Sequence, residues 1–210
     1  RVLFYHDVAH ALTCTGTVEG GPGLERRPVP LLPRAISELG GRYYQADIHP
    51  ETRIGDATFL DHPHRGMTTG QTGIIGSGCH FYPCTLGGLS DKVQQRHPEI
   101  GDYVFIGTDA GLIGPVKVGD HTVIGATAEI NGVVEIGTHC HIGVSVFIGT
   151  IKSGPIRPGK ITLGPDVRIG AGTIIENASE LDLVIPERAE IPARSYVTND
   201  GCGQPKFVRE

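Results

Sequence analysis

The sequence predicts a mainly β fold in which the chain is wound as a three-sided prism of short parallel strands, after a short helical segment. Two observations lead to this prediction. Every sixth position from Ile100 to Ile148 holds an aliphatic residue, and most of these residues are followed by Gly. Gly makes up 31 of 210 residues, which is about twice its usual share of roughly 7%. Such a chain is built from small layers and tight corners.

A strict period of six excludes the simpler elements, because a helix repeats near 3.6 residues and an open strand near 2. Each side of a prism can be one short strand with a single aliphatic residue directed at the axis, and three sides close a coil of about 18 residues. A Gly fits the corner that follows each side. The same phase recurs outside the central run, at Ile48, Ile54, Leu60, Leu163, Ile169, Ile175, Ile185, Ile191 and Val197.

The periodicity also predicts the domain organisation. Residues 1–45 carry no six-residue repeat, and "DVAHAL" and "LLPRAISELG" within them are typical of short helices around a Gly/Pro-rich connector. We therefore expect a helical N-terminal cap or stump at 1–45, a β-helix domain at 46–200, and a C-terminal tail at 201–210. Polar excursions at 87–99 and 152–160 are predicted to project from the prism as loops, where functional sites commonly form.

Composition restricts the class of protein. The apolar content of 39% supports a core, and the formal charge of −5 gives no reason to expect nucleic acid as a partner. No apolar run approaches the roughly 18 residues of a membrane span, and the first residues are too polar for a secretion signal. Five cysteines without a C-x-x-C pair argue against a disulfide framework and a zinc knuckle. We expect a soluble cytoplasmic protein. The chain begins without Met, so a preceding segment could be missing.

The repeat over residues 48–200 resembles the hexapeptide-repeat acyltransferases, whose fold is a left-handed parallel β-helix. Four motifs follow one another in the order found in the serine O-acetyltransferases of that family: "DIHP" at 47–50, "LDH" at 60–62, "TLGG" at 85–88 and "RHPEI" at 96–100. The N-terminal "VAHAL" is similar to a helix that precedes the prism there. The resemblance implies acetyl transfer from acetyl-CoA, as co-substrate, to the hydroxyl of L-serine, and no metal. It also implies a homotrimer, or a pair of trimers, with active sites in clefts between the subunits.

A histidine and a carboxylate supply the chemistry in this interpretation. His62 follows Asp47 by 15 residues, just short of one coil, so we expect the two side chains near the same corner of adjacent coils. There the carboxylate can fix the imidazole tautomer and leave the other nitrogen basic. The base can then deprotonate a hydroxyl as it attacks a thioester, without a covalent enzyme intermediate. We therefore predict that Asp47 orients the base and that His62 is the base.

The resemblance implies the remaining roles. Asp61 and His97 would bind the amino and carboxylate groups of the acceptor, and Arg96 would add positive charge. Gly88 would let its backbone N–H approach the thioester. The CoA arm would lie along the coil corners near Gly107, Thr108 and Ala126.

The sequence departs from the family pattern after His62. The segment 63–84 lacks the usual aliphatic residues, Asp109 adds an acid near the expected CoA path, and about four extra repeats continue from Leu163. These departures leave the acceptor and donor open. Homoserine, threonine, a specialised metabolite or another acyl-CoA remain alternatives to serine and acetyl-CoA.

Two other classes compete with this interpretation. A γ-type carbonic anhydrase uses the same prism with three zinc-binding histidines, but His139 and His141 lie only two residues apart and do not match its H-x-x-x-x-H spacing. A nonenzymatic scaffold is the second, although it should have lost Asp47 and His62. We expect His49 to be structural. The other histidines outside the motifs are expected to be exposed: His64, His80, His121, His139 and His141.

Overall fold

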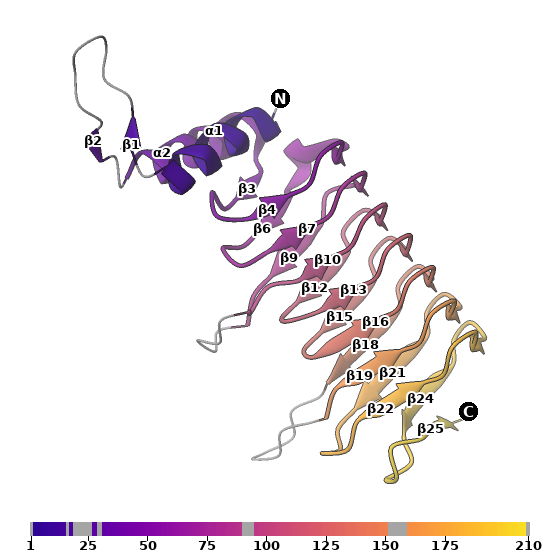
Figure 1. Ribbon diagram of the computed structural model, residues 1–210. Helices are drawn as coiled ribbons and strands as arrows, with labels where there is room; N and C mark the ends of the chain where they lie inside the picture. Colours follow the sequence, from indigo (N-terminus) through magenta and orange to yellow (C-terminus); the bar gives the residue numbers. More distant parts are fainter. Residues whose placement is uncertain are drawn as a thin grey trace.

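The computed structural model is a β-solenoid of stacked three-sided coils with two helices at its N-terminal end (Figure 1). It describes residues 2–15, 17–18, 27–28, 31–89, 95–150 and 159–208. The predicted left-handed parallel β-helix is confirmed. Three parts of the predictions lie outside the described residues: most of the Gly/Pro-rich connector, residues 90–94 of the first predicted loop and residues 152–158 of the second.

The N-terminal segment contains the two predicted helices, and both are longer than their motifs. Helix α1 spans Val2–Thr15 and α2 spans Leu32–Tyr44, while β1 (Thr17–Val18) and β2 (Arg27–Pro28) form an antiparallel pair. Two histidines of α1 attach it to the first coil: Nε2 of His6 donates to the carbonyl of Thr52 at 2.9 Å, and Nδ1 of His10 donates to that of Pro50 at 2.7 Å. The helices therefore cap the first coil.

The strands form three faces, which we number in the order in which the chain visits them. Face 1 holds β3 (Asp47–Ile48), β6 (Thr68–Thr69), β9 (Thr85–Gly87), β12 (Gly111–Ile113), β15 (Glu129–Asn131), β18 (Phe147–Thr150), β21 (Ile174–Asn177), β24 (Tyr196–Asn199) and β25 (Pro205–Val208). Face 2 holds β4 (Arg53–Ile54), β7 (Ile74–Ile75), β10 (Glu99–Ile100), β13 (Lys117–Val118), β16 (Val134–Ile136), β19 (Ile161–Leu163) and β22 (Leu183–Ile185). Face 3 holds β5 (Phe59–Leu60), β8 (His80–Phe81), β11 (Phe105–Ile106), β14 (Val123–Ile124), β17 (His141–Ile142), β20 (Arg168–Ile169) and β23 (Glu190–Ile191).

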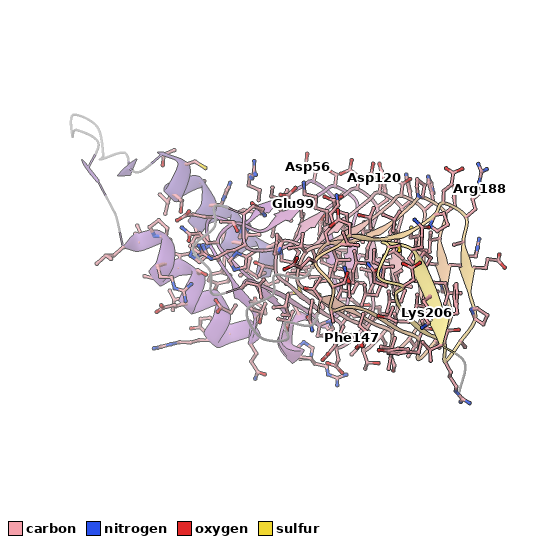
Figure 2. All side chains as sticks on the ribbon, turned by 90° about the horizontal axis from the view of Figure 1, so that it is seen from below. Asp56, Glu99, Asp120, Phe147, Arg188 and Lys206 are labelled. Carbon is pink, nitrogen blue, oxygen red and sulfur yellow. The ribbon has the colours of Figure 1, made fainter. Side chains whose placement is uncertain are left out.

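Three edges join these faces. The first edge lies between faces 1 and 2, the second between faces 2 and 3, and the third between face 3 and the next strand of face 1. Figure 2 shows the second edge along one side of the solenoid, marked by Asp56, Asp120 and Arg188, while Phe147 of face 1 projects from the opposite side.

The core is the stack of aliphatic residues that the period of six predicted. All nine residues of that spacing from Ile100 to Ile148 are at most 4% exposed. Parallel pairing brings Ile106, Ile124 and Ile142 into register on consecutive coils. Burial of one such side chain stabilises the fold by about 1.5–3 kcal/mol, so the repeat itself holds the coils together.

The glycines that follow the aliphatic residues allow neighbouring coils to stack closely. A Cβ on Gly125 would lie 2.7 Å from the backbone of Gly143 on the next coil, closer than real Cβ contacts. Most left-handed corner positions are occupied by other residues, such as His121 and His139 with φ of 57° and 56°, and only some by Gly, such as Gly78. Close stacking, more than backbone conformation, therefore requires Gly after the core residue.

The last coil is closed by an antiparallel strand. β25 pairs with β24, so the predicted tail at 201–210 contains a strand. The carboxylate of Asp200 accepts the backbone N–H groups of Cys202 and Gln204 in the connecting turn, and these hydrogen bonds lower its pKa. Across the described ranges, none of the helices has both the length and the apolar character needed to cross a bilayer.

Candidate active site

His62 lies on the third edge, immediately after β5. Its backbone is left-handed with φ of 49°, and the turn η1 (Pro63–Arg65) follows it directly. The side chain is 63% exposed, and its Nε2 lies 3.4 Å from Oδ1 of Asp61, which is 25% exposed. An accessible imidazole with a carboxylate beside it has the groups that a general base needs.

Asp47 lies on face 1 as the first residue of β3, with a side chain that is 64% exposed. Its Oδ1 is 3.8 Å from Nη1 of Arg34 in α2. Among the described residues of one chain, no ion pair joins Asp47 to His62. The reason is a longer coil: Asp47 pairs in register with Thr68, well beyond His62 in the chain, because η1 adds length at the third edge. His62 therefore lies before the position that stacks on Asp47.

His97 is buried at the first edge, where only 8% of it is exposed. The backbone N–H of Thr72 donates to its Nδ1 at 3.3 Å, and Oγ1 of Thr72 lies 2.9 Å from the same atom. Because Nδ1 accepts from a backbone N–H, the proton of the neutral ring lies on Nε2. Burial lowers the pKa of His97, and the charges of Arg96 and His49 lower it further. His97 thus presents an N–H donor from a neutral ring.

Two glycines make room for that ring. A Cβ on Gly70 would lie 1.8 Å from Nε2 of His97, and a Cβ on Gly88 would lie 2.6 Å from it. The imidazole therefore occupies the space that side chains at 70 and 88 would fill. This contact explains Gly88 without reference to a thioester, so it adds a second reason for the glycine that the sequence singled out.

A groove of about 300 Å³ brings together four of the predicted site residues, namely Asp47, Gly88, Arg96 and His97. Arg34 and His49 also line it. Nη2 of Arg96 donates to Oε1 of Gln71 at 2.9 Å, which fixes the guanidinium. The predicted structural role of His49 fits its Nδ1, which accepts the backbone N–H of Glu51 at 3.1 Å. Arg34 is paired with Glu38 and Asp47, so the positive charge available in this groove comes from Arg96, whose partner Gln71 is neutral.

The residues predicted to contact CoA lie on the same edge as His62. A Cβ on Gly107 would lie 2.6 Å from the backbone N of Ala126, so these two residues stack on consecutive coils. The backbone carbonyl of Thr108 accepts the N–H of Thr127 at 2.8 Å. A cavity of about 360 Å³ adjoins this edge, and the carboxylates of Asp109 and Glu129 line it. The predicted residues thus divide into an edge group (Asp61, His62, Gly107, Thr108, Ala126) and a groove group (Asp47, Gly88, Arg96, His97).

One histidine, His80, is less exposed than the sequence predicted. His64, His121, His139 and His141 are exposed as expected. His80 is half-buried because it lies on β8 between the aromatic rings of Phe59 and Phe105. Its Nε2 lies 3.7 Å from Oδ2 of Asp61. His80 pairs in register with Phe59 on the preceding coil, but the longer coil between them hides this pairing from the regular six-residue spacing, so no signal in the sequence revealed this neighbour.

In the part of the chain that the structure describes, no group of three or more His, Cys, Asp or Glu side chains is placed to hold a metal ion. His121 and His139 instead stack face to face on the second edge, with ring centroids 4.9 Å apart.

Comparison with known proteins agrees with the repeat and the motifs. Residues 97–132 match the family model described as bacterial transferase hexapeptide (six repeats). Fold and repeat are therefore similar to those of the hexapeptide-repeat transferases. A serine acetyltransferase of Synechococcus elongatus is 35% identical over 119 residues, which cover 56% of this chain and 47% of that protein. The chain thus spans about half the length of this curated relative.

Solved structures extend the comparison. The crystal structure of serine acetyltransferase from Vibrio cholerae O1 biovar El Tor N16961 matches with a TM-score of 0.53 and 29% identity, over 61% of this chain and 45% of that one. A Brucella abortus strain S19 serine acetyltransferase in complex with coenzyme A shares the fold at 19% identity, with a TM-score of 0.51 over 99% of this chain and 54% of that one. The predicted resemblance to serine acetyltransferases is confirmed in sequence and in fold.

Proposed function

We propose that the chain has serine O-acetyltransferase activity and transfers the acetyl group of acetyl-CoA to the hydroxyl of L-serine. The observation that carries the proposal is the exposed imidazole of His62, beside the Asp61 carboxylate and on the same edge as the predicted CoA residues. The similarity to serine acetyltransferases supports it. The five free cysteines, three of them buried, fit a reducing compartment such as the cytoplasm.

His62 acts as the general base in this proposal. It removes the proton of the serine hydroxyl while that oxygen attacks the thioester carbonyl of acetyl-CoA, which gives a tetrahedral oxyanion. The attack forms the new carbon–oxygen bond; collapse of the intermediate restores the carbonyl and breaks the carbon–sulfur bond, and the imidazolium gives its proton to the departing CoA thiolate. O-acetylserine and CoA are the products. No covalent enzyme intermediate is needed because one cleft holds both substrates.

The acceptor is a zwitterion, and the two groups of site residues suit its two ends. The Nε2–H of His97 and the guanidinium of Arg96 favour a carboxylate. Asp61 favours the ammonium group beside the base. A β-hydroxy amino acid bound in this way carries its hydroxyl one carbon beyond the carbon that bears the two charged groups, where His62 can deprotonate it.

The edge and groove groups meet between subunits in this proposal. Within the described residues, no hydrogen bond, ion pair or ring contact joins His62 to His97 or Asp47. A closed trimer can set the third edge of one copy against the groove of its neighbour, and in that cleft Asp47 can orient His62. A pair of trimers would keep the same cleft.

Acetylation assays test the activity. Purified chain with acetyl-CoA and L-serine should release free thiol and form O-acetylserine by mass spectrometry, whereas L-alanine should not react. Homoserine and threonine belong in the same assay because the altered segment 63–84 adjoins the base. Thiol release with none of these hydroxy amino acids would refute the proposed acceptor class.

The base is tested by substitution. His62→Ala should lower turnover on the order of 10² to 10⁴-fold with the fold intact. His121→Ala is a matched control, since His121 is also exposed and left-handed, with φ of 57°, but lies on the second edge. Near wild-type turnover of His62→Ala would contradict the mechanism.

Complementation tests the shared cleft. His62→Ala and His97→Ala chains are each expected to be impaired alone. When the two are co-expressed in equal amounts, about a quarter of the clefts in random trimers would combine an intact His62 with an intact His97 from the neighbour. Recovery of activity to about that level supports a site between subunits, and no recovery contradicts it.

A further inference from the structure

The carboxylate of Asp61 lies between two imidazoles. Nε2 of His62 is 3.4 Å from Oδ1, and Nε2 of His80 is 3.7 Å from Oδ2. Strand pairing creates this arrangement, because β5 and β8 are in register at Phe59 and His80, and the backbone N–H of Asp61 donates to the carbonyl of Phe81 at 2.8 Å. Asp61 is thereby fixed beside β8 on the next coil.

The ring of His80 is held from several sides. Tyr82 stacks on it with ring centroids 5.4 Å apart and an interplanar angle of 20°. Phe59 and Phe105 meet it edge-on at 5.2 Å and 5.4 Å. These contacts leave the ring little freedom to turn, so the direction of its Nε2 is set by packing.

Nε2 of His80 is buried and has no hydrogen-bond partner within the described residues. A buried polar group without a partner destabilises the fold, and Oδ2 of Asp61 is only a few tenths of an ångström beyond hydrogen-bond reach. A small rotation of the Asp61 side chain, which is 25% exposed, completes the contact.

We infer that His80 is a positioning residue for Asp61, and this inference rests on the proposed function. Its Nε2–H donates to Oδ2, so that Oδ1 remains directed at the base and at the ammonium group of the acceptor. Without His80 the carboxylate can rotate between several rotamers, and the acceptor loses a pre-oriented partner. His80 therefore tunes acceptor binding without touching the acceptor.

Two substitutions separate the hydrogen bond from the packing. His80→Phe keeps an aromatic ring and removes the donor, and it should raise the KM for L-serine about tenfold while the KM for acetyl-CoA stays unchanged. His80→Gln carries an amide donor at a similar distance and should restore the KM for L-serine to within about threefold of wild type. His141→Phe is the matched control, because His141 has the corresponding position on β17 of face 3 and is exposed.

Two kinetic outcomes would overturn the inference. One is a His80→Phe variant with a wild-type KM for L-serine. The other is a His80→Gln variant that is as impaired as His80→Phe, which would assign the effect to ring packing. Thermal melts of all three variants identify a loss of fold.

A spectroscopic measurement decides the contact without any activity. In imidazole ¹⁵N spectra at a fixed pH, Asp61→Asn should shift the signals of both His62 and His80, and His80→Phe should shift the His62 signals through the carboxylate. His141→Phe should shift neither. If Asp61→Asn moves only the His62 signals, His80 does not hold Asp61. If the wild-type protein acetylates no amino acid, the proposed function fails while this measurement still decides the contact.

Discussion

Gly70→Ala is expected to displace His97 while it leaves the solenoid folded. The new Cβ would lie 1.8 Å from Nε2 and 2.0 Å from Cδ2 of His97, far inside any real contact. The backbone of Gly70 does not lie in the left-handed region, so the alanine adds no strain of its own. The atoms in the way belong to a side chain, which can turn aside. His97 would then leave Thr72, whose N–H donates to its Nδ1 at 3.3 Å.

The expected magnitude follows from the contact that is lost. A hydrogen bond to a charged group contributes about 1.5–3 kcal/mol, so kcat/KM for the amino acid should fall about 10- to 150-fold if His97 binds the acceptor carboxylate. The KM for acetyl-CoA should remain unchanged. Overpacking of this kind lowers the free energy of unfolding by about 1–3 kcal/mol, which still leaves a folded protein to assay.

A double-mutant cycle tests the reasoning. Once His97→Ala has removed the ring, Gly70→Ala should have almost no further effect on the acceptor KM. Gly41→Ala is the control, since Gly41 lies in α2 and its Cβ would meet only the Ala46 carbonyl at an ordinary 3.4 Å. A full Gly70→Ala effect in the His97→Ala background, or a crystal structure of Gly70→Ala with His97 in place, would refute the displacement.

Three further predictions concern stability, reactivity and assembly. Burial lowers the pKa of His6 below its ordinary 6.5, so the unfolded chain binds the proton more readily. The free energy of unfolding should therefore fall as pH drops below about 6.5, by at most ~1.4 kcal/mol per pH unit, and urea titrations should show a smaller fall in His6→Gln. Burial raises the pKa of Cys84 to about 12, so a thiol reagent should label Cys14 and Cys202 quickly and Cys84 only after unfolding. Light scattering should give about three or six times 22.3 kDa, and a monomer at micromolar concentration would contradict the shared cleft.

The fold could be predicted because its core repeats. Each side of a coil places one side chain at the axis. A strand register shifted by one residue would therefore direct the aliphatic residues to the surface, which the strict period of six excludes. The run from Ile100 to Ile148 therefore fixed the register before any strand was known. The helices at 2–15 and 32–44 were predictable from local patterns, but their contacts with the first coil, through His6 and His10, depend on the tertiary arrangement.

The site was less predictable because edges, unlike faces, vary in length. The sequence spacing between Asp47 and His62 places them together only if the coil that joins them has the regular length of three six-residue sides. The turn η1 lengthens this coil so that Asp47 aligns with Thr68. Sequence spacing cannot reveal such an insertion, since Pro63 and Gly66 are compatible with both a tight corner and a longer turn.

The same insertion explains why His80 escaped the sequence analysis. On a regular coil, the outward residue of β8 would be one exposed histidine among several, as His141 is on β17. Here the outward column of face 3 begins with Phe59, His80 and Phe105, whose rings are in contact on consecutive strands. This packing turns a surface position into a half-buried one beside Asp61. On a rigid solenoid, outward residues of neighbouring coils are separated by one strand spacing, about 4.8 Å. A side chain one coil away can therefore reach a carboxylate at the edge as closely as a sequence neighbour can, and residues of the coil that follows the base have the geometry to control it.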